Sequence, residues 1–153
     1  MPLTLAEHFA LIEEEYRASL EAPLSARRAM LVVVLLDQFA DRVFAAHRAQ
    51  GPEKVLFAED VLAYRAALAD RSPALAAIFS LCALKPEGPV LQVVAIEVPI
   101  ADYPQLPVED YMVSLYNKNT VQRVVIALPD GRQTLAHGVL AEALRWWEAA
   151  GYA

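Results

Sequence analysis

The 153-residue chain has few of the residues that mark redox, metal or phosphate sites. It contains one cysteine, Cys82, which can form neither an intramolecular disulfide nor a zinc site of thiolates by itself. Its five glycines are isolated from one another, so neither a phosphate-binding loop nor a dinucleotide fingerprint can be built from them. No acidic residue and histidine share the repeated helical spacing of a carboxylate-bridged metal pair. We therefore expect no cofactor and no metal.

Positive charge is also scarce. Thirteen basic residues stand against 19 acidic ones, which gives a net charge of −6 and a sequence pI near 5.0. The three lysines are scattered, and Arg27 and Arg28 form the one adjacent basic pair. Since an acidic surface repels a phosphate backbone, we expect no nucleic acid among the partners.

Long apolar runs are missing as well. The longest, residues 29–36, is far shorter than the roughly 20 residues that cross a bilayer. The first residues lack the basic stretch and apolar run of a signal peptide. We expect no membrane partner and a cytoplasmic location.

The chain does contain ample material for a packed core, because 57% of its residues are hydrophobic and 21% are charged. Its length fits one domain, residues 1–153. In the first half, Thr4 and Glu7 form a capping box before a helix over residues 5–21. A longer helix begins at Ala26 and ends near Gln50; its start is apolar on every side, which predicts the central helix of the fold. Two more helices are expected over residues 59–70 and 73–84.

After residues 85–89 the helical spacing gives way to short β-branched runs. Residues 90–98 are nearly all apolar, which predicts a strand buried on both faces. Residues 121–128 and 132–135 are expected to form two more strands, before a last helix from about Gly138 to Ala150. Residues 111–116 fit either a fourth strand in a hairpin, which we favour, or a short helix. The fold class predicted is α+β: about four helices, a small and mostly antiparallel sheet of three or four strands, and a C-terminal helix.

Two acids and two basic residues on the central helix are the candidate catalytic group. Asp37 and Asp41 lie four residues apart, so their carboxylates share one helix face, where pairing with an arginine is the favoured role. The spacing of Arg42 and His47 resembles that of the Arg and His of HEPN-type ribonucleases, helical proteins whose histidine serves acid-base chemistry and whose arginine binds phosphate. The likeness is confined to these two residues. It supports an alternative function, a small hydrolase or phosphodiester-cleaving enzyme that uses all four residues.

The other polar candidates have structural interpretations. His8 flanks the apolar stripe of the first helix, and Cys82 lies among apolar residues that keep a thiol protonated. His137 precedes the last helix and lacks a serine or cysteine nucleophile in a recognisable motif. We assign these residues to packing or helix capping.

Aromatic residues gather in the second half of the chain. Trp146, Trp147 and Tyr116 are the predicted interaction residues, because aromatic side chains with a polar tip are enriched where proteins meet. The function predicted is a non-catalytic interaction or regulatory module, homodimeric through the sheet and the last helix. A further alternative is a small apolar-ligand binder. Its cavity would be lined by Phe39, Val43, Phe44, Ile96 and Tyr111.

Overall fold

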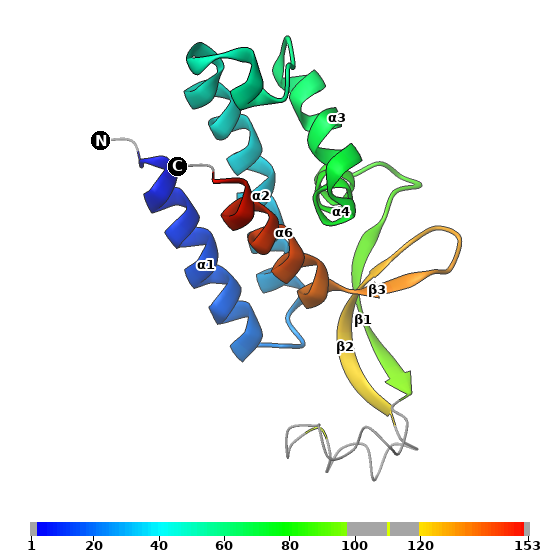
Figure 1. Cartoon of the computed structure of the whole chain (residues 1–153). Helices are drawn as coiled ribbons and strands as arrows, with labels where there is room; N and C mark the ends of the chain where they lie inside the picture. Colours follow the sequence, from blue (N-terminus) through cyan, green and yellow to red (C-terminus); the bar gives the residue numbers. More distant parts are fainter. Residues whose placement is uncertain (1–2, 98–109, 111–119, 152–153) are drawn as a thin grey trace.

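The computed structural model describes residues 3–97, 110 and 120–151 (Figure 1). In chain order the elements are α1 (Leu5–Glu21), α2 (Ala26–His47), the 3-10 turns η1 (Arg48–Gln50) and η2 (Pro52–Val55), α3 (Val61–Arg71), α4 (Pro73–Cys82), β1 (Val90–Glu97), β2 (Thr120–Ala127), β3 (Gln133–Leu135) and α6 (Ala136–Ala150). Helices precede an antiparallel sheet of three described strands, and a helix closes the chain. The predicted α+β class is confirmed.

Local chemistry explains where the helices begin and end. Thr4 accepts from the Glu7 amide while the Glu7 carboxylate accepts from the Thr4 amide at 2.7 Å, so the predicted capping box is present. Ser72 caps α4, which has Pro73 at its first position. α2 ends at His47 and continues as a 3-10 turn, because Gly51 at φ 134° cannot prolong a helix.

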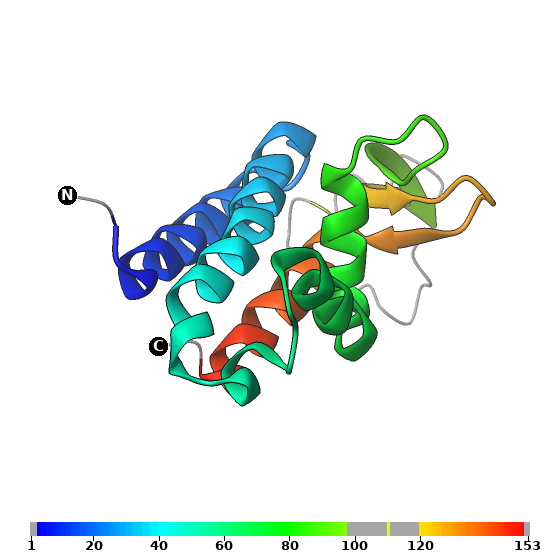
Figure 2. The ribbon, with the colours of Figure 1, turned by 90° about the horizontal axis from the view of Figure 1, so that it is seen from above.

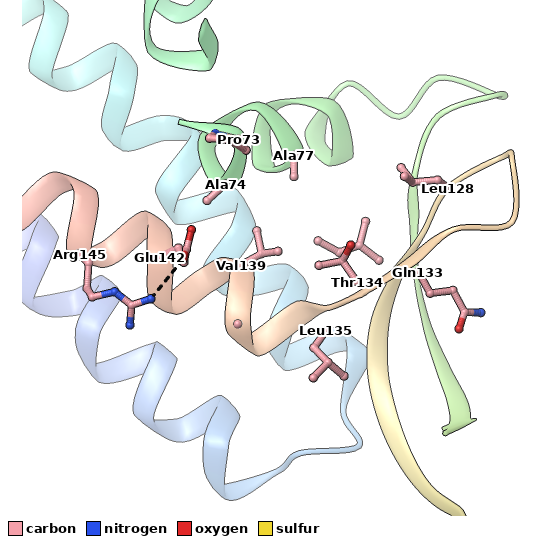
Figure 3. Close-up of a pocket in the computed structure, with 12 residues that line it drawn as sticks. Pro73, Ala74, Ala77, Leu128, Gln133, Thr134, Leu135, Val139, Glu142 and Arg145 are labelled. Atoms are coloured by element: carbon pink, nitrogen blue, oxygen red, sulfur yellow. Dashed lines mark ion pairs between the residues drawn. The ribbon is translucent and has the colours of Figure 1, made fainter. Parts of the chain in front are cut away.

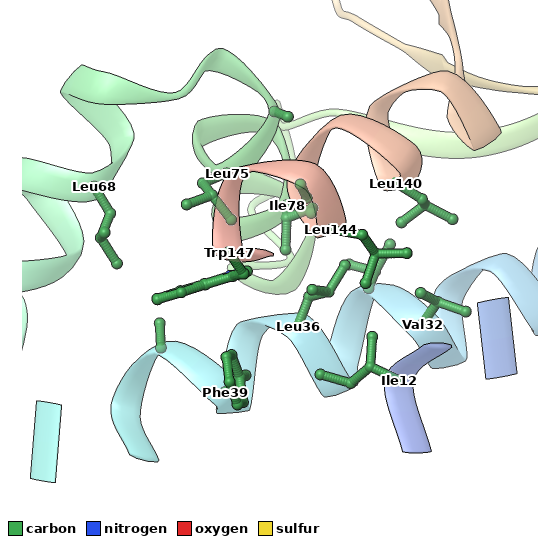
Figure 4. Close-up of a cluster of buried hydrophobic side chains, with 14 of the residues drawn as sticks. Ile12, Val32, Leu36, Phe39, Leu68, Leu75, Ile78, Leu140, Leu144 and Trp147 are labelled. Carbon is green, nitrogen blue, oxygen red and sulfur yellow. The ribbon is translucent and has the colours of Figure 1, made fainter. Parts of the chain in front are cut away.

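α2 is the central helix, as predicted. It contacts α1, α3, α4 and α6, and α1 and α6 flank it in Figures 1 and 2. Its Phe39 ring lies 5.0 Å from the Trp147 ring of α6, nearly perpendicular to it. Figure 4 shows Leu36 and Trp147 between α2 and α6. These apolar contacts pack the helices around α2.

The sheet has the order β1-β2-β3. β1 pairs with all of β2, from Val90 opposite Ala127 to Glu97 opposite Thr120. In the turn into β3, Gly131 donates to the Leu128 carbonyl and takes φ 91°, a conformation that glycine adopts without strain. The predicted short strand after this turn is confirmed as β3, and the last helix begins two residues before Gly138.

The prediction that residues 90–98 are buried on both faces is wrong for the described part, β1. β1 lies at one edge of the three described strands and none of its residues is fully buried; Val90 and Val93 are 47% and 42% exposed. The buried strand is β2, with Val124 and Val125 at 1% exposure. An apolar run does not distinguish a central strand from an edge strand, because strand order is decided by pairing. Residues 111–116 lie outside the described residues.

Within the described residues, no helix is both long enough and apolar enough to span a membrane.

Candidate functional site

Asp37 and Asp41 are held by one arginine of α3. Arg65 forms an ion pair with Asp37 through Nη2, and its Nη1 lies 3.0 Å from Asp41 Oδ1. Nη1 also donates to the Asp37 carbonyl oxygen at 3.1 Å. The two acids therefore share a face, as predicted, and both accept from a cation of another helix. This arrangement locks α3 onto α2 and pairs both acids with a single guanidinium.

The surroundings of Arg65 make this ion pair a structural anchor. Burial by itself would lower the pKa of Arg65, but hydrogen bonds and charges from Asp37 and Asp41 outweigh it and raise the pKa. The guanidinium lies 4.2 Å above the centroid of the Phe79 ring. Burial, together with the Asp37 charge, raises the pKa of nearby Cys82 to about 11, so the thiol stays protonated.

Arg42 faces α1 and binds His8. Its Nη1 lies 2.9 Å from His8 Nδ1, and its Nη2 donates to the Leu3 carbonyl oxygen. Because arginine only donates, His8 Nδ1 must accept, so the ring is neutral. Burial and then the Arg42 charge lower the pKa of His8, against an opposing effect of the Leu35 backbone. Arg42 thus ties the start of α1 to α2.

His47 lies apart from the other three candidates. It lines a pocket of about 330 Å³ between the end of α2, the η2 turn and the end of α6. Tyr64 and Trp146 line the same pocket, and burial raises the pKa of Tyr64 to about 12. The structure brings Asp37 and Asp41 together and places Arg42 and His47 in two other surroundings.

The predicted interaction residues divide between core and surface. Trp147 is 1% exposed and belongs to the core, whereas Trp146 is partly buried beside it, with ring centroids 5.0 Å apart. The buried Trp147 Nε1 has no hydrogen-bond partner among the described residues. Tyr116 lies outside the described residues.

The residues predicted to line an apolar cavity are also separated. Phe39, Val43 and Phe44 are packed in the core, and Ile96 lies on β1 at the edge of the sheet. Tyr111 is outside the described residues. The hollow that does form between helices and sheet is an open groove built from other side chains.

This groove has a volume of about 730 Å³ and lies between α4, α6 and the β2–β3 hairpin (Figure 3). Its lining is mainly apolar or small: Pro73, Ala74, Ala77, Ile126, Leu128, Gln133, Thr134, Leu135, Gly138, Val139, Glu142 and Arg145. Gly138 belongs to this lining, and a Cβ added there would meet nothing within 4 Å. Glu142 and Arg145 form an exposed ion pair of 3.5 Å at the end along α6. We call it the α4–β3–α6 groove.

The groove crosses the edge of β3 that no other described strand covers. Thr134 lies opposite Ile126 and faces the core side of the sheet, while Gln133 and Leu135 face the other side. A groove that contacts all three residues extends over the edge itself. Because the Leu128 amide donates to the Arg132 carbonyl oxygen, the main-chain groups of Gln133 point away from β2. The groove therefore offers apolar side chains and main-chain hydrogen-bonding groups together.

Two further observations bear on chemistry. Across the described ranges, no group of three histidine, cysteine or acidic side chains is placed to hold a metal ion. No family description, curated protein or solved structure matches the chain.

Sequence reasoning did not find Arg65, His8 or the groove as parts of these sites. The anchor could have been suspected, because the two acids required a cation and Arg65 lies on a neighbouring predicted helix. The groove had no such signal, since alanine and glycine at its base have no distinctive pattern in the sequence.

Proposed function

We propose that this protein is a non-catalytic interaction module that works as a homodimer and binds an extended apolar segment of a partner protein in the α4–β3–α6 groove. The observation that carries the proposal is an open apolar groove of about 730 Å³ that runs over an edge of β3 against which no described strand lies. An extended segment placed there would bury apolar side chains and add a strand to β3.

The separation of the candidate catalytic residues supports a non-catalytic role. An acid-base mechanism requires its groups within hydrogen-bond reach of one reacting site. Asp37 and Asp41 are paired with Arg65, and Arg42 is paired with His8. His47 lines a pocket that has none of these residues in its lining.

The β3 edge limits what the groove can accept. The Gln133 amide and carbonyl point away from β2. Leu135, by contrast, is the N-cap residue of α6, so its carbonyl belongs to the first turn of that helix. A partner segment would thus gain a few main-chain hydrogen bonds, and most of its affinity would come from side chains buried against Val139 and Ala77. We place the module in the cytoplasm, which suits a chain with one unpaired cysteine.

Selection of peptides tests this function. A phage-displayed library of random peptides would be selected on the wild-type protein and then measured on two arginine variants. Ala77→Arg fills the groove, so we expect selected peptides to lose at least about tenfold in affinity, or about 1.4 kcal/mol. Ala66→Arg adds the same side chain to an exposed position of α3 outside the groove and should leave binding unchanged.

The outcomes are separable. Apolar peptides that bind wild type and Ala66→Arg but not Ala77→Arg support the groove. Peptides that bind all three proteins equally, or a library that yields no binder, contradict it. Gln133→Pro removes one outward amide, so a further small loss of affinity would identify strand addition.

A further inference from the structure

β1 is an edge strand of the sheet that the described residues form. It pairs with β2 over its whole length, and in the part of the chain that the structure describes no strand lies against its other side. Proteins usually protect such an edge with proline, lysine or a bulge. Val90–Glu97 contains no proline and no lysine, and its pairing with β2 has no bulge. An unprotected edge of eight residues is a template for another strand.

The hydrogen-bond alternation identifies the groups that this edge presents. The Leu128 amide donates to the Arg132 carbonyl oxygen. The main-chain amide and carbonyl groups of Leu128, and of every second residue before it, therefore point toward β3. The groups of Ala127 and Val125 therefore point toward β1. The main-chain groups of the β1 residues opposite Ala127 and Val125 point toward β2 in turn. The main-chain groups of the alternate β1 residues point away from β2: these residues are Leu91, Val93, Ala95 and Glu97.

We infer that β1 pairs antiparallel with β1 of a second copy of this chain, about a two-fold axis at Val94. An antiparallel ladder is symmetric about such an axis, so one edge can serve both partners. Centring the axis at Val94 places Val93 opposite Ala95 of the second copy and Leu91 opposite Glu97. In this register the outward-pointing amide and carbonyl groups of all four residues form hydrogen bonds with the second copy. The two sheets then join into one continuous sheet.

Side-chain exposure and charge favour this partner. Val93 is 42% exposed, although its neighbour across the ladder, Val124, is buried at 1%. A second β1 would cover Val93. Glu97 is the one charged residue of β1. Antiparallel pairing separates the two Glu97 side chains by roughly 20 Å along the strands, well beyond the Debye length of about 8 Å, whereas parallel pairing would place them side by side.

The inference rests on the homodimer of the proposed function and specifies its contact. The α4–β3–α6 groove lies at the opposite edge of the sheet, so both sites can be occupied at once. Peptide binding and dimer formation are therefore separate measurements on the same protein.

Proline variants at the two edges test the contact. Ala95→Pro removes an outward amide, which an edge strand tolerates in the monomer but a paired strand does not. Gln133→Pro makes the matched change at the β3 edge. Sedimentation of the wild type should give twice the chain mass of 16.8 kDa. We expect Ala95→Pro to halve that mass and Gln133→Pro to retain it, with circular dichroism confirming that both fold.

Single cysteines test the register, including the case in which Ala95→Pro fails to fold. Val94→Cys places two thiols opposite each other at the axis, where the Cα atoms of a non-hydrogen-bonded pair lie about 4.5 Å apart. It should form a disulfide-linked dimer under mild oxidation. Gln92→Cys on the same face lies four residues from its copy in this register and should not. The protonated Cys82 does not compete.

Several results would overturn the inference. These are a monomeric wild type at high micromolar concentration, a folded Ala95→Pro that remains dimeric, and equal cross-linking of Val94→Cys and Gln92→Cys. Loss of the dimer in Gln133→Pro alone would place the contact at β3. If the wild type is monomeric but still loses its peptides in Ala77→Arg, the groove function stands and the β1 contact fails.

Discussion

The helical body and the sheet differ in how far each covers its own surface. α2 is packed on several sides, and Leu36, Phe39 and Trp147 are at most 1% exposed. By contrast, β1 and β3 have no fully buried residue, and the buried part of the sheet is confined to β2. Helices satisfy their main-chain hydrogen bonds internally, but an edge strand needs a neighbour. Among the described strands, the unpaired main-chain groups therefore lie at the outer edges of β1 and β3.

The largest expected effect comes from breaking the helical body at Trp147. Trp147→Ala removes a fully buried ring between α6 and α2 and should lower the free energy of unfolding by about 3–5 kcal/mol. Val90→Ala on β1 removes methyl groups from a 47% exposed side chain and should lower the free energy of unfolding by less than about 1 kcal/mol. Urea unfolding measures both. Similar losses in the two variants would mean that the sheet is as tightly packed as the helices.

Two arginines sharpen the comparison at an intermediate scale. Arg65→Met leaves the partly buried Asp37 without its ion-pair partner. It should lower the free energy of unfolding by about 1–3 kcal/mol in the same assay. Arg132 forms a 2.6 Å ion pair with Asp130 in the exposed hairpin, with side chains 77% and 52% exposed. Arg132→Met should therefore cost less than about 0.5 kcal/mol. A neutral Arg65→Met would refute the role of Arg65 as an anchor.

The smallest effect is a pH dependence that arises from His8. Burial and the Arg42 charge lower its pKa in the folded protein below the usual 6.5. As the pH falls through about 6.5, the unfolded chain binds a proton first, so stability is complete above that pH and declines below it. Unfolding midpoints between about pH 7.5 and 5 should fall less steeply in His8→Gln than in wild type.

His137, at the junction of β3 and α6, is a second source of this pH dependence. Burial, with a contribution from Arg123, lowers its pKa too, against an opposing effect of the Ser19 backbone. His137→Gln should remove a further part of the acid sensitivity, and the double variant with His8→Gln should be flattest. Superimposable pH profiles of wild type and His8→Gln would show that the contact between His8 and Arg42 does not depend on a neutral ring.

Most of the helical half could be predicted from the sequence. The capping box at Thr4, the Ser72 cap before Pro73 and the apolar start of α2 are local signals, and local signals are sufficient for helix boundaries. The strands were located, but the burial of β1 was misjudged. The candidate acids were identified without their partner, Arg65, because the sequence does not specify which helix packs against which.

What the sequence determined by itself was therefore the order of elements, the acidic surface and the absence of phosphate-loop and thiolate-zinc motifs. These features depend on neighbouring residues or on composition, and both are present in the unfolded chain. The tertiary structure decided that β2 lies between β1 and β3, that four candidate residues of α2 divide among three surroundings, and that small side chains of α4 and α6 leave a groove. Each of these depends on contacts between residues distant in the chain, which form only when the elements pack.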